Sequence, residues 1–405
     1  MRDATVYLHF PWCLEKCPYC DFVSYKVDRP AIAHEAYADA VLAELEARVS
    51  TLGDSLASRR FISIFVGGGT PSLWASESLG RVLEALRSRL HFIDDPEVTV
   101  ECNPSSLSEG HARDLRAIGV NRLSVGVQSL DDEDLKYLGR LHDGAGAMNA
   151  LRAAQTAGFK RVSGDLIYAL PVHSAEASLP MAGQLLDLGL THVSAYQLTI
   201  EPGTRFGELA KRGRLPMADE GTSAEAFLAL DSYMEGRGLR HYEVSNFAVP
   251  GQESVHNTGY WRGLEYLALG CGAYGFWRME GPGEPAWGVR YLNEKLPESY
   301  MQLARTMRDG TGFTAETTGH STTASTERLD GETLVKERIM LGLRMADGFH
   351  VEASEADLLV PVRTPERQRS ADKLEQRGRL CAEGERWLVP KSRWLFVDGT
   401  AAELF

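Results

Sequence analysis

The 405-residue chain has few cysteines and no long hydrophobic run. Six cysteines are too few for a secreted scaffold held together by disulfides, and this number is compatible with a reducing compartment. No stretch approaches the roughly 18 consecutive apolar residues of a membrane span. The first five residues lead directly into a strand-like run without the apolar region of a signal peptide. We therefore expect a soluble, cytoplasmic protein.

Positive charge is also scarce. The chain has 43 Lys and Arg residues against 56 Asp and Glu residues, which gives a formal net charge of -13. Such a balance disfavours a broad surface for the phosphate backbone of nucleic acids, so we expect no nucleic-acid partner.

Three of the cysteines stand close together near the N-terminus. Cys13, Cys17 and Cys20 have the spacing C-x3-C-x2-C and follow the first strand-like run directly. Three thiolates are one fewer than a closed [4Fe–4S] site requires, so a cluster bound here would expose one iron to an outside ligand. A zinc site would need a fourth Cys or His, and neither His9 nor His34 stands at a usual spacing. The pattern therefore favours a three-cysteine iron–sulfur cluster over zinc or a disulfide.

Short apolar runs alternate with stretches of helical spacing through the first 250 residues. The predicted strands are Val6–Phe10, Phe61–Val66, Val98–Cys102, Arg122–Val127, Arg161–Leu166 and His192–Gln197. The predicted helices are Ala36–Val49, Ser76–Leu90, Ser108–Ile118, Asp132–Leu138, Ala145–Ala157 and Ala177–Leu188. Strands that alternate with helices form parallel βαβ units with right-handed crossovers. We therefore expect an α/β fold in which residues 1–245 form a partial (β/α)6 barrel of the TIM type.

Chemically useful residues fall at the predicted strand ends, where barrels of this kind gather their chemistry. Gly67-Gly-Gly-Thr-Pro71 follows the second strand, and its glycines let backbone groups approach a ligand closely. Glu101, Gln128 and Asp165 end the third, fourth and fifth strands. Their carboxylate and amide groups can bind the polar groups of a ligand. With Arg140 and the cysteines, these residues are predicted to converge on one rim.

The pattern loosens after residue 245. Residues 246–307, which contain His256-Asn-Thr-Gly-Tyr-Trp261 and a glycine-rich segment at 269–275, are expected to close the core. Residues 308–330 are rich in Thr, Ser and Gly and have no periodicity, so they are predicted to form a flexible linker or loop.

Residues 331–405 are expected to form a smaller C-terminal α+β domain. Helices are predicted at Glu332–Met345 and Thr364–Arg377, and Cys381–Val389 with Arg393–Val397 resemble a small hairpin. Such an arrangement is typical of a winged helix, although the acidic balance gives no support for nucleic-acid binding.

These motifs together resemble the radical S-adenosylmethionine (SAM) superfamily, in which CxxxCxYC follows a first strand and GGGTP a second. The wider set looks like the branch that contains anaerobic coproporphyrinogen oxidase and the HemW-type heme chaperones. The segments that carry this resemblance are Tyr7-Leu-His-Phe-Pro-Trp-Cys13, Gly67-Gly-Gly-Thr-Pro-Ser72, Glu101-Cys-Asn-Pro104, Gly126-Val-Gln-Ser129 and Asp165-Leu-Ile-Tyr-Ala-Leu-Pro171. The resemblance extends from about residue 5 to the end, so residues 331–405 would be a HemW-like domain.

The resemblance implies the cofactors of the site. Cys13, Cys17 and Cys20 would bind a [4Fe–4S] cluster, whose open iron would be chelated by the amino and carboxylate groups of SAM. One electron from a reductant such as flavodoxin or ferredoxin would then cleave SAM to methionine and a 5′-deoxyadenosyl radical. By motif match, the residues that contact this SAM are Tyr7, Tyr19, Gly68, Gly69, Thr70 and Glu101. The residues matching a second SAM site or the substrate cavity are Gln128, Arg140 and Asp165.

The HNxxYW motif at 256–261 is similar to that of the HemW-type proteins, whose His is implicated in heme binding. A neutral imidazole is a usual axial ligand of heme iron. The resemblance therefore implies heme as cargo on His256, an acceptor hemoprotein, and transient membrane association through that acceptor. The alternative for His256 is a histidine hydrogen-bonded in a loop beside Tyr260 and Trp261.

Two residues depart from the family pattern, and two further functions are left open. Tyr274 stands where relatives usually have His, and Ala169 replaces a usual glycine, which could narrow the cavity. The further functions are an oxygen-independent coproporphyrinogen III oxidase, which forms protoporphyrinogen IX by oxidative decarboxylation, and a radical SAM methylase or cyclopropanase. The sequence does not say whether SAM is cleaved productively. Cys102, Cys271 and Cys381 are expected only to be small buried thiols.

Overall fold

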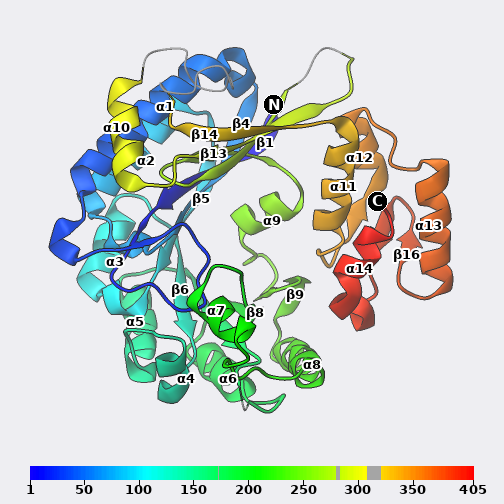
Figure 1. Ribbon diagram of the computed structural model, residues 1–405, viewed down its shortest axis with the longest axis horizontal. Helices are drawn as coiled ribbons and strands as arrows, with labels where there is room; N and C mark the ends of the chain where they lie inside the picture. The colour runs from blue at the N-terminus through cyan, green and yellow to red at the C-terminus, as the bar shows by residue number, and fades with distance from the viewer. Residues whose placement is uncertain (172, 280–282, 308–320) are drawn as a thin grey trace.

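An open sheet of twelve strands runs through the computed structural model, which describes residues 1–171, 173–279, 283–307 and 321–405 (Figure 1). Its centre consists of parallel strands in the order of the sequence. These are β1 (Arg2–Phe10), β4 (Arg59–Gly68), β5 (Phe92–Cys102), β6 (Arg122–Gln128), β7 (Arg161–Tyr168) and β8 (His192–Gln197). Each predicted strand lies within one of them, so the predicted partial barrel is confirmed.

Helices follow these strands and cover the outer face of the barrel (Figure 1). They are α1 (His34–Ala57), α2 (Ser76–Arg89), α3 (Glu109–Ala117), α4 (Asp132–Tyr137), α5 (Gly144–Thr156) and α6 (Leu179–Asp187). Asp131 accepts hydrogen bonds from the backbone N–H groups of Glu133 and Asp134, which fixes the start of α4. All the helices predicted for this part of the chain are confirmed.

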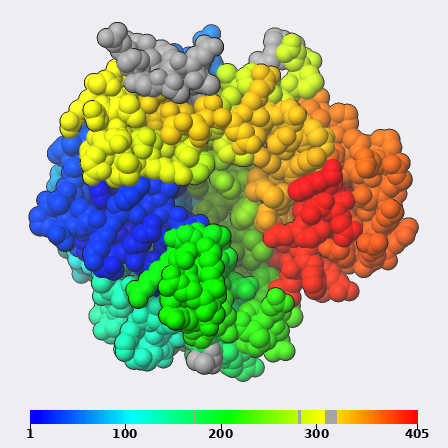
Figure 2. Space-filling view, viewed as in Figure 1, coloured from blue at the N-terminus to red at the C-terminus, as the bar shows by residue number. Residues whose placement is uncertain are grey.

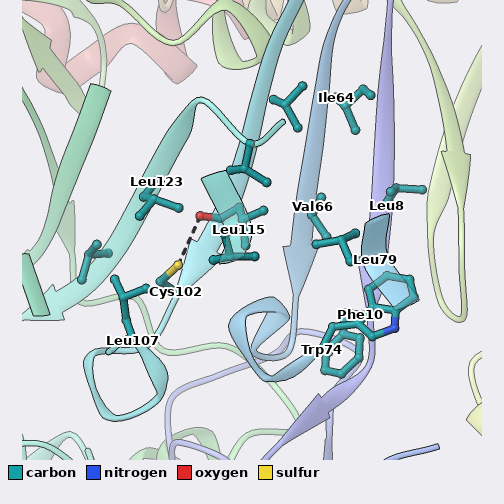
Figure 3. Close-up of a cluster of buried hydrophobic side chains, with 14 of the residues drawn as sticks. Leu8, Phe10, Ile64, Val66, Trp74, Leu79, Cys102, Leu107, Leu115 and Leu123 are labelled. Atoms are coloured by element: carbon teal, nitrogen blue, oxygen red, sulfur yellow. Dashed lines mark hydrogen bonds between the residues drawn. The ribbon is translucent and has the colours of Figure 1, made fainter. Parts of the chain in front are cut away.

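The main hydrophobic core lies between the strands and these helices (Figure 3). Side chains alternate between the two faces of a strand, so Leu8 and Phe10 of β1 point into this core. Trp74 stacks on Phe10 with 5.3 Å between ring centroids. Cys102 lies in the same core with its thiol 3.6 Å from the carbonyl of Val100, as expected for a small buried thiol.

Further strands extend the sheet at both edges. At one edge β8 pairs with β10 (Asn246–Ala248) and then β9 (Arg240–Glu243). On the other side β11 (Glu265–Leu269) lies parallel to β1, followed by the antiparallel strands β12 (Tyr274–Met279), β13 (Trp287–Asn293) and β14 (Thr323–Leu329).

Strand β14 corrects part of the predicted linker at 308–330. Residues 308–320 of that linker lie outside the described residues, whereas Thr323–Leu329 pair with β13. The side chains of this edge strand are mostly polar and exposed, so the hydrophobic alternation that marks a half-buried strand is absent from its sequence.

The C-terminal domain has a core of its own. It contains α11 (Gly331–Gly342), α12 (Val351–Leu358), α13 (Pro365–Gln376) and α14 (Val397–Ala402), with the small sheet β15 (Phe349–His350), β17 (Arg386–Leu388) and β16 (Cys381–Glu383). Both predicted helices and the hairpin β16–β17 are present. The predicted second hairpin segment, Arg393–Val397, is wrong: a 3-10 helix spans Lys391–Phe396, and the indole N–H of Trp394 donates to the carbonyl of Val389.

The remaining helices are α7 (Arg205–Lys211), α8 (Glu220–Gly236), α9 (Val255–Trp261) and α10 (Pro297–Thr306). Helix α9 lies at the centre of the view in Figure 1, between the barrel strands and the C-terminal domain. Across the described ranges, no helix combines the length and the apolar character that crossing a bilayer demands.

Candidate functional site

The three clustered cysteines lie on a closed loop that follows β1. Short strands β2 (Trp12–Cys13) and β3 (Tyr25–Lys26) pair and close this cysteine loop. The ammonium group of Lys16 donates to the carbonyls of Phe22 and Ser24 and so links the two halves of the loop. All three cysteines are free thiols: Cys13 is buried, and Cys17 and Cys20 are half-buried.

Side chains of the barrel hydrogen-bond two of the three sulfurs. Thr70 Oγ1 donates to Cys13 Sγ at 3.3 Å, and Arg140 Nη1 donates to Cys17 Sγ at 3.4 Å. Burial raises the pKa of the Cys13 and Cys20 thiols, and the Thr70 hydrogen bond acts against that rise at Cys13. Donors of this kind favour thiolates, which are the form that binds iron.

The three cysteine sulfurs do not converge on a single point. Within the described ranges, no group of three or more Cys, His, Asp or Glu side chains could hold one metal ion. Three cysteines of a [4Fe–4S] cluster each bind a different iron, so their sulfurs need not meet at one point.

The glycine segment after β4 is shaped by close contacts. A Cβ on Gly69 would lie 2.7 Å from the carbonyl oxygen of Trp12, and one on Gly68 would lie 2.6 Å from the ring of His9. Gly68 also has a φ of 115°, which side-chain-bearing residues rarely adopt. The glycines therefore let this strand end lie directly against the cysteine loop, and the Gly68 N–H donates to Glu101 Oε2 at 3.1 Å.

His9 is a site residue that sequence analysis missed. Its Nε2 donates to the carbonyl of Val23 at 2.7 Å on the cysteine loop, which leaves Nδ1 to accept from the hydroxyl of Tyr7 at 3.0 Å. Burial lowers the pKa of His9 to about 4, so the ring is neutral and keeps this pattern. Only its place in the segment that leads to the cysteines could have indicated a role.

Two half-buried carboxyl groups, Glu101 and Asp165, lie near enough at the strand ends for the charge of one to act on the other. Burial, with the charge of Asp165, raises the pKa of Glu101 to about 8. Burial also raises the pKa of Asp165 to about 6, although the Ser124 hydroxyl donates to its carboxylate at 2.9 Å. The Gly68 N–H at Glu101 and the Ser124 hydroxyl at Asp165 do not offset the effect of burial, and a ligand with hydroxyl or amino groups would supply further donors.

Two further residues of the site, Arg140 and Gln128, also have features that a bound ligand would explain. Arg140 Nη2 donates to the carbonyl of Gly126 at 3.0 Å, but its buried Nε has no hydrogen-bond partner among the described residues. A buried guanidinium with an unused N–H, beside Cys17, fits the carboxylate of a ligand such as SAM. Gln128 ends β6 with a φ of 65°, a strained conformation for a residue other than glycine, and such strain clusters at functional sites.

The predicted SAM residues are thus brought together. Tyr19 lies on the cysteine loop beside Cys17 and Arg140, and its ring packs against Phe206 at 6.4 Å. A Cβ atom placed on Gly67 would contact the side chains of both Tyr7 and Glu101, so these two side chains lie close together.

His256 lies inside the barrel on α9, not in a loop. Its ring stacks on Phe65 with 4.8 Å between centroids and lies 6.5 Å from the ring of Tyr7. Nδ1 is 3.1 Å from the Ser63 hydroxyl, and the backbone N–H donates to Glu97 Oε1 at 3.1 Å. Its Nε2 makes no hydrogen bond to a residue that the structure describes. Burial lowers the pKa of His256 to about 3, so the imidazole is neutral.

The two residues that depart from the family pattern, Ala169 and Tyr274, lie in different surroundings. Ala169 has a φ of 57°, in the left-handed region, which explains why glycine suits this position. Tyr274 begins β12 and is exposed.

The molecule is hollowed in two places near these residues. In Figure 2 the centre of the visible face is recessed, and the yellow-green segment with α9 lies behind green α7 and the red C-terminal helices. A separate cavity of about 900 Å³ adjoins the cysteine loop and is lined by Cys17 and Cys20.

Known proteins share both parts of this architecture. Residues 7–178 match the Radical SAM superfamily, and residues 329–396 match the HemN C-terminal domain. Heme chaperone HemW from Haemophilus influenzae is 36% identical over 303 residues, which cover 75% of this chain and 76% of that protein. Heme chaperone HemW from Escherichia coli is 38% identical over 276 residues, 68% of this chain and 70% of that protein.

The solved structure of coproporphyrinogen III oxidase (HemN) from Escherichia coli, a radical SAM enzyme, matches with a TM-score of 0.78. The match covers 100% of this chain and 90% of that chain at 19% identity, so it shows a common fold. From the family matches and the HemW relatives, the chain belongs to the HemW-type proteins of the radical SAM superfamily, a membership that implies SAM and a [4Fe–4S] cluster.

Proposed function

We propose that this protein binds heme through His256 and delivers it to an acceptor hemoprotein, on a scaffold that carries a [4Fe–4S] cluster and SAM. The observation that supports heme binding is the state of the imidazole. It is neutral, its Nδ1 is held by Ser63, and its Nε2 is unused among the described contacts. A neutral imidazole fixed through one nitrogen is a usual iron ligand through the other.

The cofactor site follows from the contacts around the cysteine loop. Cys13, Cys17 and Cys20 would hold the cluster, and with SAM it would supply one-electron radical chemistry when bound. Arg140 would pair with the SAM carboxylate through its unused Nε. Gly68, Gly69, Thr70, Tyr7 and Tyr19 would shape the pocket around SAM.

The carboxyl groups of Glu101 and Asp165 would accept hydrogen bonds from hydroxyl or amino groups of SAM, assisted by the amide of Gln128. Such donors favour the ionised carboxylates, so ligand binding would lower both raised pKa values. The site would therefore release protons when SAM binds near neutral pH.

Ferric heme titration of the His256→Ala variant tests heme binding. We expect a loss of at least about tenfold in affinity and a changed Soret band, because the iron loses its axial ligand. The control is His91→Ala, which alters an exposed histidine. Added imidazole should restore the Soret band of His256→Ala by filling the vacated space. Unchanged affinity and spectrum in a folded variant would overturn His256 as the ligand.

Delivery is tested separately by mixing the heme-loaded protein with an apo-b-type cytochrome. Transfer should appear as the spectrum of the holo-cytochrome, faster than from free heme at the same concentration. Heme that stays on the protein, or dissociates first, would contradict a chaperone role.

An oxygen-independent coproporphyrinogen III oxidase is the second candidate. The polar groups Glu101, Asp165 and Arg140 support it, because the SAM that they would bind supplies radical chemistry that heme delivery alone does not use. Anaerobic incubation with SAM, reductant and coproporphyrinogen III decides the matter. Absence of protoporphyrinogen IX would exclude this activity.

A further inference from the structure

The 14 tyrosines of the chain all lie in the described ranges, and three of them, Tyr196, Tyr260 and Tyr274, are exposed. Each of the three faces the interior of the barrel rather than its outer surface. Ligand sites are lined mainly by apolar and aromatic side chains, so exposed rings gathered inside a barrel point to a ligand. The proposed function above uses none of the three.

The alternation of side chains along the strands shows where two of these rings point. On β8, Val193 and Ala195 belong to the main core between strands and helices, so Tyr196 points the opposite way, into the barrel. On β12, Trp277 belongs to that core, so Tyr274, three positions earlier, also points inward.

Tyr260 reaches the same region from α9. Its ring centroid lies 5.1 Å from that of Tyr266 on β11, and Tyr266 is paired with Phe276 on β12. Tyr260 and His256 are four residues apart on α9, so they share one face of this helix. The exposed rings are therefore continuous with the surroundings of His256.

Aromatic rings cover the inner face of four neighbouring strands, β4, β1, β11 and β12. Phe65 of β4 pairs with Tyr7 of β1, and Tyr7 pairs with Ala268 of β11. Tyr274 of β12 lies opposite Ala268 in the antiparallel pairing of β11 with β12. We call this surface the aromatic wall, and its members are Tyr7, Phe65, Tyr266, Tyr274 and Phe276.

The aromatic wall is wide enough for a flat macrocycle of four pyrroles. Neighbouring strands lie about 4.8 Å apart, so the backbones at Tyr7 and Tyr274 are about 10 Å apart, with the small side chain of Ala268 between them. A cavity of about 260 Å³ adjoins the wall and is lined by Tyr260 and Phe276. The recess at the centre of Figure 2 contains the yellow-green segment to which α9 belongs.

The opposite side of the barrel interior is polar. The inner faces of β5, β6 and β7 carry Glu101, Ser124 and Asp165. These are among the groups placed around SAM above. An apolar ring system bound in the same barrel therefore has its place on the aromatic wall, away from the polar side.

We propose that the aromatic wall binds the flat ring system of a tetrapyrrole, so that metal-free porphyrins bind here as well as heme. The choice of a tetrapyrrole rests on the proposed function, since the His256 ring lies 4.8 Å from Phe65 and 6.5 Å from Tyr7 of the wall. Aromatic side chains stack on flat π systems whether or not these hold a metal. Recognition is then divided: the wall binds the macrocycle, and His256 binds the iron.

The test compares heme with protoporphyrin IX, which has the same macrocycle without iron. Both are titrated into the full-length protein, heme by absorbance and protoporphyrin IX by fluorescence. Tyr274→Ser removes an exposed ring of the wall, and Tyr274→Phe keeps the ring. Leu228→Ser is the control for nonspecific apolar binding, because Leu228 is 47% exposed on α8, which packs beside α6 in the outer helix layer. His256→Ala removes the proposed iron ligand.

We expect Tyr274→Ser to lower the affinity for both ligands at least about fivefold, because one stacked ring is lost. Tyr274→Phe and Leu228→Ser should match the unaltered protein, and His256→Ala should lower the affinity for heme alone. Failure of the unaltered protein to bind protoporphyrin IX overturns the proposal. Undiminished protoporphyrin affinity in Tyr274→Ser overturns it too, as does an equal loss in Leu228→Ser.

Failure of this inference differs from failure of the proposed function. If His256→Ala leaves heme affinity unchanged while Tyr274→Ser lowers it, the proposed iron ligand is wrong and the aromatic wall stands. If Tyr274→Ser lowers the affinity for heme alone, its phenol acts on the iron and the macrocycle proposal is wrong. Tyr260→Ser repeats the test should Tyr274→Ser fail to fold.

Discussion

Several single residues around the cysteine loop are held in states that cost stability. The N–H of Arg140 Nε is buried and finds no partner in the described part of the chain, and Glu101 lies near a second carboxyl group, that of Asp165. Unsatisfied buried polar groups cost about 1–3 kcal/mol each. Groups of this kind mark functional sites, where a ligand completes them.

The Glu101→Gln variant should be more stable than the ligand-free parent at pH 8. Burial raises the pKa of Glu101 from 4.5 to about 8, so between these values the folded state holds a proton that the unfolded state has released. Stability therefore falls as pH rises through this window, by up to about 1.4 kcal/mol per pH unit. Glutamine does not titrate and removes this slope. Urea unfolding at pH 5, 6, 7 and 8 measures it, and equal slopes would refute the prediction.

The Thr70→Val variant should lower the midpoint potential of the cluster. Thr70 donates to Cys13 Sγ at 3.3 Å, and donors to sulfur stabilise the reduced, more negative cluster. Loss of one hydrogen bond of about 1 kcal/mol corresponds to about 40 mV for a one-electron couple. Redox titration followed by EPR measures the shift, with Thr70→Ser as the variant that keeps the donor. An unchanged potential in Thr70→Val would show that this contact does not act on the cluster.

At the scale of single residues, the sequence predicted which side chains gather around the cysteine loop but not the local backbone strain. The cysteine spacing and the glycine segment indicate their role because their chemistry depends on residue type and spacing. The role of His9 depends on Val23, 14 residues further along, and appears only in the folded loop. The left-handed conformation of Ala169 likewise belongs to the backbone and leaves no trace in an alanine.

Among the secondary-structure elements, α9 determines where His256 lies. It has seven residues, is capped at its start by the side chain of Ser254, and is held against the barrel by Glu97. Glu97 Oε1 accepts from the Ser254 hydroxyl and from the His256 N–H, while Oε2 faces the guanidinium of Arg122 at 3.4 Å. A helix of this length has too few turns for hydrophobic periodicity, which is why the sequence indicated only a motif there.

The Glu97→Gln variant should destabilise the protein by about 3–5 kcal/mol, because Arg122 would keep a buried charge without its carboxylate. Arg161→Gln is the control: Arg161 lies 4.0 Å from Glu97 and is 35% exposed. Its removal should cost less than about 1 kcal/mol. Chemical denaturation measures both variants. Similar losses in the two would show that burial of the Arg122 pair is not what matters.

In the whole molecule, one carboxylate joins the C-terminal domain to the barrel. Asp357 on α12 contacts Arg278 of β12 at 2.6 Å, Arg338 of α11 at 2.8 Å and Arg2 of β1 at 3.6 Å. Arg278 is buried and Arg338 is 16% exposed, but Asp357 is 31% exposed, so the junction is only partly shielded from water. The sequence predicted two domains but could not predict this junction. Asp357 lies 79 residues along the chain from Arg278 and 19 residues from Arg338, so only the folded chain brings them together.

The Asp357→Asn variant should loosen the contact between the two domains. Two neighbouring guanidinium groups would lose their shared counter-charge, at a cost of about 1–3 kcal/mol because Asp357 is partly exposed. Thermal unfolding and limited proteolysis should show an earlier release of the C-terminal domain. Asp398→Asn is the matched control, since Asp398 pairs with Arg344 but is 74% exposed, and its loss should be below about 1 kcal/mol. Identical proteolysis of both variants would contradict the role of Asp357.

The order of strands around β1 has a consequence for biosynthesis. The strand that leads into the cysteines pairs with β4 on one side and with β11 on the other. About 200 residues separate these neighbours, or about 10–40 s of synthesis on the ribosome. For that interval the thiols stand at the open border of a half-built sheet.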